Sequence, residues 1–351
     1  MLNPQTDHSS KPKISTGMRF IWIVLGVLSS VFFLLSSGEV FLRYINNFGL
    51  DDFTERNRYY DTLKVGRYVI RNRNNTHGKF AGVQVDINAL GFRGEQANTH
   101  KKSGVYRILM LGDEKTFGWR IPEEKTYSAR LQTLLDEHFI GKFEVLNGGV
   151  PGYDLPQMAD YISRFALQYR PDVICMLLGT DDVIGNLEPK NLEETFNHGL
   201  LKTSYLARYL YCSFIYQPHL IPDKKIQEEA RRSIRKIESL TMKAGIPLII
   251  ILWTTSDDEM RPEAARAMPH PKMLVHAIVI DSEPLMTTLR PKHARVGLIG
   301  GYPSERAHQL LAQLHLGAIA LKSPNFIFVL RDGKSIPRNL LLNGGNEDNN
   351  E

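Results

Sequence analysis

The hydrophobic pattern divides the chain into three parts. Residues 20–38 form an apolar run without a charged side chain. Residues 66–93 contain short alternations of apolar and polar positions separated by turn-forming residues, which predict short strands. After residue 101, apolar runs alternate with amphipathic segments, the pattern of a parallel sheet covered by helices on both faces. We therefore predict a membrane helix, a small β-rich segment and an α/β domain, in that order.

The elements of the α/β part can be placed along the chain. Five strands are expected at 106–111, 143–146, 173–178, 248–253 and 276–281, with a further short strand at 325–330. Helices are expected at 127–139, 155–169, 224–244 and 304–321. Ser304 is the candidate N-cap of the last helix. Residues 185–223 have no clear period and predict an inserted, partly helical segment.

The apolar run is long enough to span a bilayer. Its 19 residues reach roughly 28 Å as a helix, close to the ~30 Å hydrocarbon core. Lys11, Lys13 and Arg19 precede it and acidic residues follow it, so the positive-inside rule keeps the N-terminus cytoplasmic. We expect a single-pass protein of the inner (cytoplasmic) membrane with its C-terminal domain in the periplasm or outside. A cleaved signal peptide ending near the small residues 36–38 is the competing interpretation.

The expected organisation has five parts. They are a cytoplasmic N-terminus (1–19), a transmembrane anchor (20–38), a stalk with a short β-rich segment (39–100), the α/β domain (101–331) and a disordered tail (332–351).

Composition narrows the class of protein. The 351 residues are 42% hydrophobic and 23% charged, which excludes a wholly disordered chain. Two cysteines exclude a disulfide scaffold and a four-cysteine zinc site. Cys175 lies in an apolar run, which favours a buried free thiol. The net charge of +5 is not concentrated in one segment and predicts no nucleic-acid partner.

Catalytic or ligand-binding residues are expected in the loops at the carboxyl ends of the strands, where parallel α/β sheets bind ligands. Three such loops carry motif-like residues, Gly-Asp-Glu-Lys-Thr-Phe-Gly at 112–118, Asn-Gly-Gly-Val-Pro-Gly-Tyr at 147–153 and Gly-Thr-Asp-Asp at 179–182. A fourth stretch, Tyr-Pro-Ser-Glu-Arg-Ala-His at 302–308, opens the last helix.

In this order the four stretches resemble the blocks of the SGNH (GDSL-type) hydrolase family, and the resemblance extends from about residue 86 to residue 321. It implies a flavodoxin-like, three-layer SGNH-type parallel sheet. In the family a serine is the nucleophile, a histidine its base and an aspartate the group that orients the histidine. Backbone N–H groups of the serine and a glycine, with an asparagine amide, hold the oxyanion.

The framework residues of these blocks are present and the catalytic side chains are replaced. Asp113 and Gly149 match the family. Glu114 stands at the serine position, Asp181 at the asparagine position and Tyr302 at the histidine position, while Ile299 replaces the aspartate. Glu114 has no hydroxyl group that could attack a substrate. The carboxylate of Asp181 would repel an oxyanion, and the loss of one oxyanion donor already raises the activation barrier by roughly 3–4 kcal/mol. Tyr302, with an ordinary pKa near 10, is a poor base.

The resemblance therefore predicts a degenerate pocket formed by Asp113, Glu114, Gly149, Asp181 and Tyr302, with no catalytic residue, metal or cofactor. Two alternatives stay open. Ser304 and His308 could form a relocated catalytic pair, although helix capping explains Ser304 better. Glu114 and Asp181 could act as the carboxylate pair of a glycosidase or hold a hard cation.

The expected function is that of a membrane-anchored binding or assembly subunit on the exported side of the membrane. Its expected partners are the membrane itself, through the N-terminal helix, and a protein of a membrane complex or an envelope glycan. The alternative function is an atypical esterase or acyltransferase acting on an envelope glycan or lipid.

Overall fold

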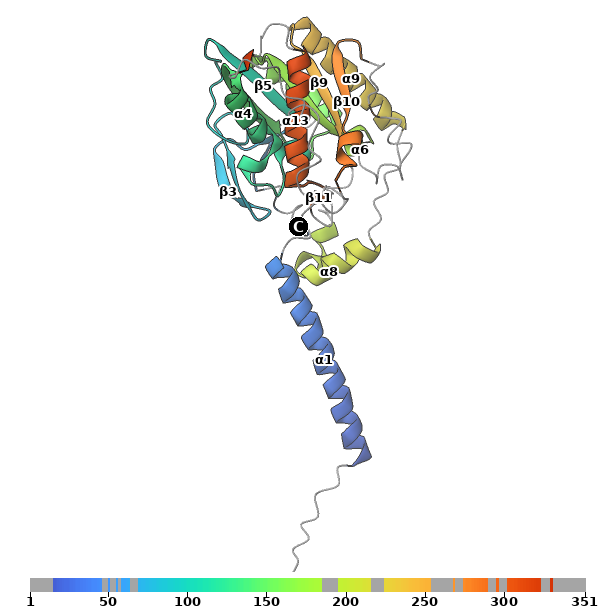
Figure 1. Ribbon diagram of the computed structural model, residues 1–351. Coiled ribbons are helices and arrows are strands. Elements are labelled where there is room, and N and C mark those ends of the chain that lie inside the picture. The colour runs from blue at the N-terminus through green and yellow to red at the C-terminus, as the bar shows by residue number, and fades with distance from the viewer. Residues whose placement is uncertain are drawn as a thin grey trace, which may run out of the picture.

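The computed structural model describes most of the chain as an α/β domain with a long helix extending from it (Figure 1). The described residues are 15–45, 50, 55, 58–63, 69–184, 195–215, 224–253, 268, 274–289, 295–296, 302–322 and 329–330. The predicted tail at 332–351 and the first 14 residues lie outside these ranges.

A five-stranded parallel sheet forms the centre of the domain. Its strands are β5 (Val105–Gly112), β7 (Lys142–Gly149), β8 (Val173–Gly179), β9 (Leu248–Trp253) and β10 (Ala277–Asp281). They lie in the order β10-β9-β8-β5-β7, and all neighbours are parallel. Numbered along the chain this is 2-1-3-4-5, the flavodoxin-like order. The predicted fold class is confirmed.

Helices cover both faces of the sheet because its central strands β8 and β9 have no polar side chain. In β8, side chains at alternate positions enter two different cores: Ile174 and Met176 face one, Val173 and Cys175 the other. The first core lies against α5 (Leu155–Arg164) and α9 (Lys224–Lys243). The second lies against α4 (Tyr127–His138) and α13 (Glu305–Lys322), which Figure 1 shows side by side in front of the sheet.

Side-chain caps explain where the main helices begin. Thr126 accepts from the Ala129 N–H at the start of α4, and Asp154 forms a capping box with Gln157 at the start of α5. The predicted cap of the last helix is confirmed, since Ser304 accepts from the Ala307 N–H. The helix predicted at 155–169 ends at Arg164 and is followed by a separate 3-10 turn, Ala166–Tyr169.

Two antiparallel hairpins precede the sheet. They are β1 (Tyr60–Leu63) with β2 (Val69–Asn72) and β3 (Thr76–Phe80) with β4 (Val83–Ile87). The buried Arg93, which follows them, donates to the carbonyl oxygens of Phe117, Gly118 and Ile121 at 2.6–2.8 Å. These bonds tie the β-rich segment to the loop after α3 (Glu114–Phe117).

Shorter elements complete the described fold. They are the 3-10 helices η1 (Glu123–Lys125), η2 (Ala166–Tyr169) and η3 (Gly199–Lys202), the helices α6 (Thr180–Ile184), α8 (Tyr205–Leu210) and α11 (Glu283–Met286), the π-helical turn η4 (Tyr211–Ile215) and the strand pairs β6 (Phe139–Ile140) with β13 (Val329–Leu330) and β11 (Arg295–Val296) with β12 (Tyr302–Pro303).

The apolar run forms part of α1 (Thr16–Ile45), which projects away from the domain (Figure 1). Its mean hydropathy reaches 2.3 over 18 residues, and no part of that window is buried against protein. The helix is a candidate single membrane span, and a signal sequence would satisfy the same criteria.

Candidate functional site

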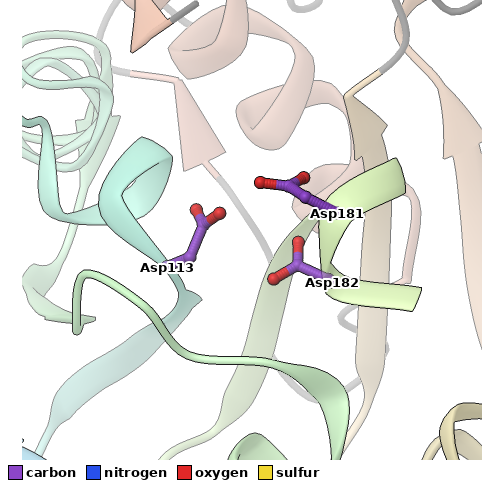
Figure 2. Close-up of side chains that lie close together, drawn as sticks. All are labelled: Asp113, Asp181 and Asp182. Atoms are coloured by element: carbon purple, nitrogen blue, oxygen red, sulfur yellow. The ribbon is translucent and has the colours of Figure 1, made fainter. Parts of the chain in front are cut away.

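The candidate site lies where the strand order reverses. β5 and β8 are neighbours in the sheet, although β7 comes between them in the chain. Asp113 follows β5 and caps α3, while Asp181 and Asp182 lie in the first turn of α6 after β8. Figure 2 shows the three carboxyl groups converging from these two elements. One oxygen from each of the three groups lies within 4.8 Å of those from the other two.

Lys115 supplies a positive charge to this group of carboxylates. Its Nζ donates to both carboxylate oxygens of Asp181, at 2.9 and 2.7 Å, and to Oδ2 of Asp113. Burial alone would lower the pKa of Lys115, but the carboxylates of Asp113 and Asp181 outweigh burial and raise that pKa well above its usual value. Lys115 is therefore a permanent cation within the site.

Gly179 allows Lys115 to reach this position. A β-carbon at residue 179 would overlap Oδ1 of Asp181 and lie 2.9 Å from Nζ of Lys115. A larger residue at position 179 would therefore displace the side chains of Lys115 and Asp181.

Asp182 is almost fully buried, like Asp113. Its Oδ2 accepts from the Gly179 N–H at 2.7 Å, and its Oδ1 has no hydrogen-bond partner among the described residues. Burial, and next the charge of Asp113, raise the pKa of Asp182 well above its usual value. Burial also raises the pKa of Asp113, against the opposing effect of Lys115. Burial therefore favours the protonated form of Asp182.

Glu114 occupies the first position of α3 and is almost fully buried. Its Oε2 accepts from the Gly152 N–H at 2.9 Å, which connects α3 to the loop after β7. The side chain at the position of the family's nucleophile is thus held by a backbone contact within the protein.

Gly149, the last residue of β7, lies against the backbone of α3. A β-carbon at residue 149 would collide with the backbone of Phe117, so only glycine fits between β7 and α3. The Gly149 N–H donates to Oδ1 of Asn147 at 3.1 Å. The backbone donor that the family resemblance assigns to an oxyanion is therefore bonded to a side chain of this protein.

Tyr302 begins β12 and is buried in an aromatic cluster with Tyr59, Phe117 and Trp119. Phe117 belongs to α3, so this cluster packs against the helix that follows Asp113. Of the other site residues predicted from the sequence, Asp113, Glu114, Gly149 and Asp181 lie at the ends of β5, β7 and β8. Ile299 lies outside the described residues.

His308 connects α13 to the start of α4. Its Nδ1 accepts from the Tyr127 N–H at 3.0 Å, at the first turn of α4, and its ring stacks on that of Tyr127. Burial lowers the pKa of His308 to about 3, so the ring is neutral. Ser304 caps α13. Both side chains of the proposed relocated pair thus have structural contacts of their own.

Lys115 is the residue of this site that the sequence-based prediction missed. It is the variable position of the first block, so the family resemblance gives it no role. The signal that could have identified it was charge: one lysine follows an Asp-Glu pair in the first loop, and a second pair of acids lies in the neighbouring loop.

The three aspartates have the donor set of a hard-cation site. The ammonium group of Lys115 already bonds two of the three, Asp113 and Asp181. The geometry favours an internal lysine as the cation of this site.

No protein-family profile matches the chain, and no curated protein matches it. Similar solved structures include TesA (12% identity, 61% of this chain and 97% of that chain, TM-score 0.41). They also include Axe2, an acetylxylan esterase from Geobacillus stearothermophilus (15% identity, 64% and 98%, TM-score 0.39), and a family 3 carbohydrate esterase from Clostridium thermocellum (14% identity, 60% and 93%, TM-score 0.38). The flavodoxin-like assignment of the sheet rests on its observed strand order.

Proposed function

We propose that this protein is a catalytically inactive SGNH hydrolase-like subunit, anchored in the inner membrane by α1, with its α/β domain in the periplasm or outside. In this role the domain binds a protein of a membrane complex or an envelope glycan. The observation that carries the proposal is the position of Lys115. Its ammonium group contacts residue 181, where the family places the oxyanion amide, and residue 113 next to the nucleophile position.

The surrounding contacts support the absence of catalysis. Glu114 accepts a hydrogen bond from the Gly152 N–H, and the Gly149 N–H is bonded to Asn147. A substrate carbonyl would have to displace these contacts and also lie against the Asp181 carboxylate. Each change opposes the stabilisation of a developing negative charge.

The contacts of α1 support an anchor that is retained. The helix continues without a break through residues 36–38 to Ile45. Gly38 lies beside Leu206, because a β-carbon at residue 38 would be 3.8 Å from the leucine methyl groups, and Leu42 is buried. Glu39 accepts from the backbone N–H groups of Tyr205 and Leu206 at 2.9 Å. The end of α1 is thus part of the folded structure.

A serine-directed fluorophosphonate probe tests the inactive state. The full chain in detergent is treated with the probe beside an active esterase of the same fold, and labelled peptides are identified by mass spectrometry. We expect no labelled serine in this protein. Stoichiometric labelling at one serine, abolished by its substitution with alanine, would contradict the proposal.

Co-purification from membranes tests the binding role. We expect a partner that remains bound to the Glu114→Ala variant, because the proposed role does not use carboxylate chemistry. Loss of every partner in a variant that is folded and membrane-bound would contradict this role.

A further inference from the structure

The segment that meets the end of α1 has an exposed apolar face. It consists of η3, α8 and η4 (199–215), and Figure 1 shows α8 running across the end of α1, below the α/β domain. Four large apolar side chains of this segment are exposed to solvent: Leu200, Leu210, Phe214 and Ile215. Phe214 is 78% and Ile215 67% exposed, although both belong to regular helical structure.

Three of these exposed side chains lie on one side of α8 and η4. Leu210 and Phe214 are four residues apart, and the wider π-helical turn of η4 brings Ile215 to the same side. The opposite side is covered: Tyr211 and Cys212 pack against the buried Phe196. The segment is therefore amphipathic, and its protein-facing side is already occupied.

The contacts of this segment with α1 fix its depth along the membrane normal when α1 spans a bilayer. Glu39, directly after the apolar run, accepts from Ser204 Oγ and from the Tyr205 and Leu206 N–H groups. Tyr44, 89% exposed in the last turn of α1, is of the type that marks the membrane–water interface. Glu39 and Tyr44 are separated by about 7–8 Å along the helix, roughly the thickness of one interfacial region. The N-terminus of α8 thus lies at the interface when α1 spans.

We propose that α8 and η4 lie in the outer interface of the membrane, with Leu210, Phe214 and Ile215 inserted among the lipids as a second attachment beside α1. Amphipathic helices at this depth bury their apolar face about 5–10 Å into the headgroup and acyl boundary. This inference rests on the proposed membrane anchor. Its consequence is a fixed orientation, because a helix that lies in the interface prevents the domain from tilting freely about α1.

Accessibility of a nitroxide label tests the position of this face. The full chain carries Cys212→Ser and one labelled substitution, Phe214→Cys, and is placed in nanodiscs of phosphatidylethanolamine and phosphatidylglycerol. Collisions with apolar oxygen and with a polar nickel complex are measured. Leu28→Cys in the middle of the span and Glu137→Cys on the exposed side of α4 are the references. Ile215→Cys repeats the measurement if Phe214→Cys does not fold.

We expect the label at 214 to resemble the label at 28, with high oxygen and low nickel accessibility, while the label at 137 reports water. A label at 214 that resembles 137 while 28 reports lipid would overturn the interfacial position and leave the anchor intact. A label at 214 shielded from both reagents would indicate a protein partner or a second copy instead of lipid, and would also overturn the inference. A label at 28 that reports water would refute the anchor itself.

Discussion

Lys115 on α3 and Asp181 on α6 are joined by two hydrogen bonds of 2.9 and 2.7 Å although they are 66 residues apart in the chain. The same ammonium group bonds the fully buried Asp113. One lysine thus connects the ends of β5 and β8 at the edge of the sheet where parallel α/β folds bind ligands. We expect this contact to contribute to stability as well as to prevent catalysis.

Replacing Lys115 with methionine should destabilise the protein strongly. The change leaves Asp113 buried without its counter-charge, and removing one partner of a buried ion pair costs about 3–5 kcal/mol. In a domain of this size about 3 kcal/mol lowers the melting temperature by roughly 6–12 °C. The measurement is thermal unfolding of the full chain in detergent at pH 8.

A matched control is Lys125→Met. Lys125 pairs with Glu305 at 2.9 Å, but both side chains are more than 40% exposed, so the expected cost is at most about 1 kcal/mol. Equal melting temperatures for the Lys115→Met variant and the wild type would show that the buried lysine has no structural role.

Asp182→Asn should make stability less sensitive to rising pH. The folded state holds a proton on Asp182 that the unfolded chain releases near pH 4, because burial raises the folded pKa. Wild-type stability therefore falls as the pH rises from about 4 toward the folded pKa. Asparagine keeps the acceptor for the Gly179 N–H and does not titrate.

The free energy of unfolding of the Asp182→Asn variant, relative to wild type, should increase between pH 5 and pH 8. Asp136→Asn, at an exposed position of α4, is the control and should show a constant difference. A constant difference for Asp182→Asn as well would mean that Asp182 is ionised in the folded protein.

His308→Gln should make stability less sensitive to falling pH. Burial lowers the pKa of His308 to about 3, whereas an unfolded histidine titrates near 6.5. The stability due to the neutral ring is complete above pH 6.5 and is lost as the pH falls toward 3. Glutamine can accept from the Tyr127 N–H and does not titrate. Melting temperatures at pH 7 and pH 4.5 should therefore differ less in the variant than in the wild type, and an unchanged difference would contradict the buried neutral histidine.

Glu39→Ala should loosen the start of α8. The change removes the acceptor for the Tyr205 and Leu206 N–H groups, and loss of a capping side chain costs about 1 kcal/mol. Amide hydrogen exchange at residues 205 and 206 should become roughly five times faster. Glu137→Ala on α4 is the control and should leave these amides unchanged. Unchanged exchange in both variants would show that α1 does not hold α8.

Much of the fold was predictable from the sequence because its strands are continuous apolar runs. The run 248–253 gives a strand with the same bounds, and the caps of α4, α5 and α13 follow from local polar residues. The helix at 155–169 was predicted too long. Arg170, before Pro171, adopts a left-handed conformation, so the chain turns there, and the preceding turn is 3-10.

The site was predictable only in part. The family blocks bring Asp113, Glu114, Gly149 and Asp181 together, as their strands end at one edge of the sheet. They give no information about Lys115, whose place depends on side-chain packing against Gly179. The contact of Glu39 with α8 was not predictable either, because it joins residues more than 160 positions apart.

The most direct test of the central claim is turnover of p-nitrophenyl acetate by the full chain. Wild type, Glu114→Ala and Lys115→Ala are compared with buffer alone and with an active esterase of the same fold. We expect rates at the buffer background for all three forms of this protein. A wild-type rate well above background that is lost in Glu114→Ala, while that variant stays folded, would contradict it.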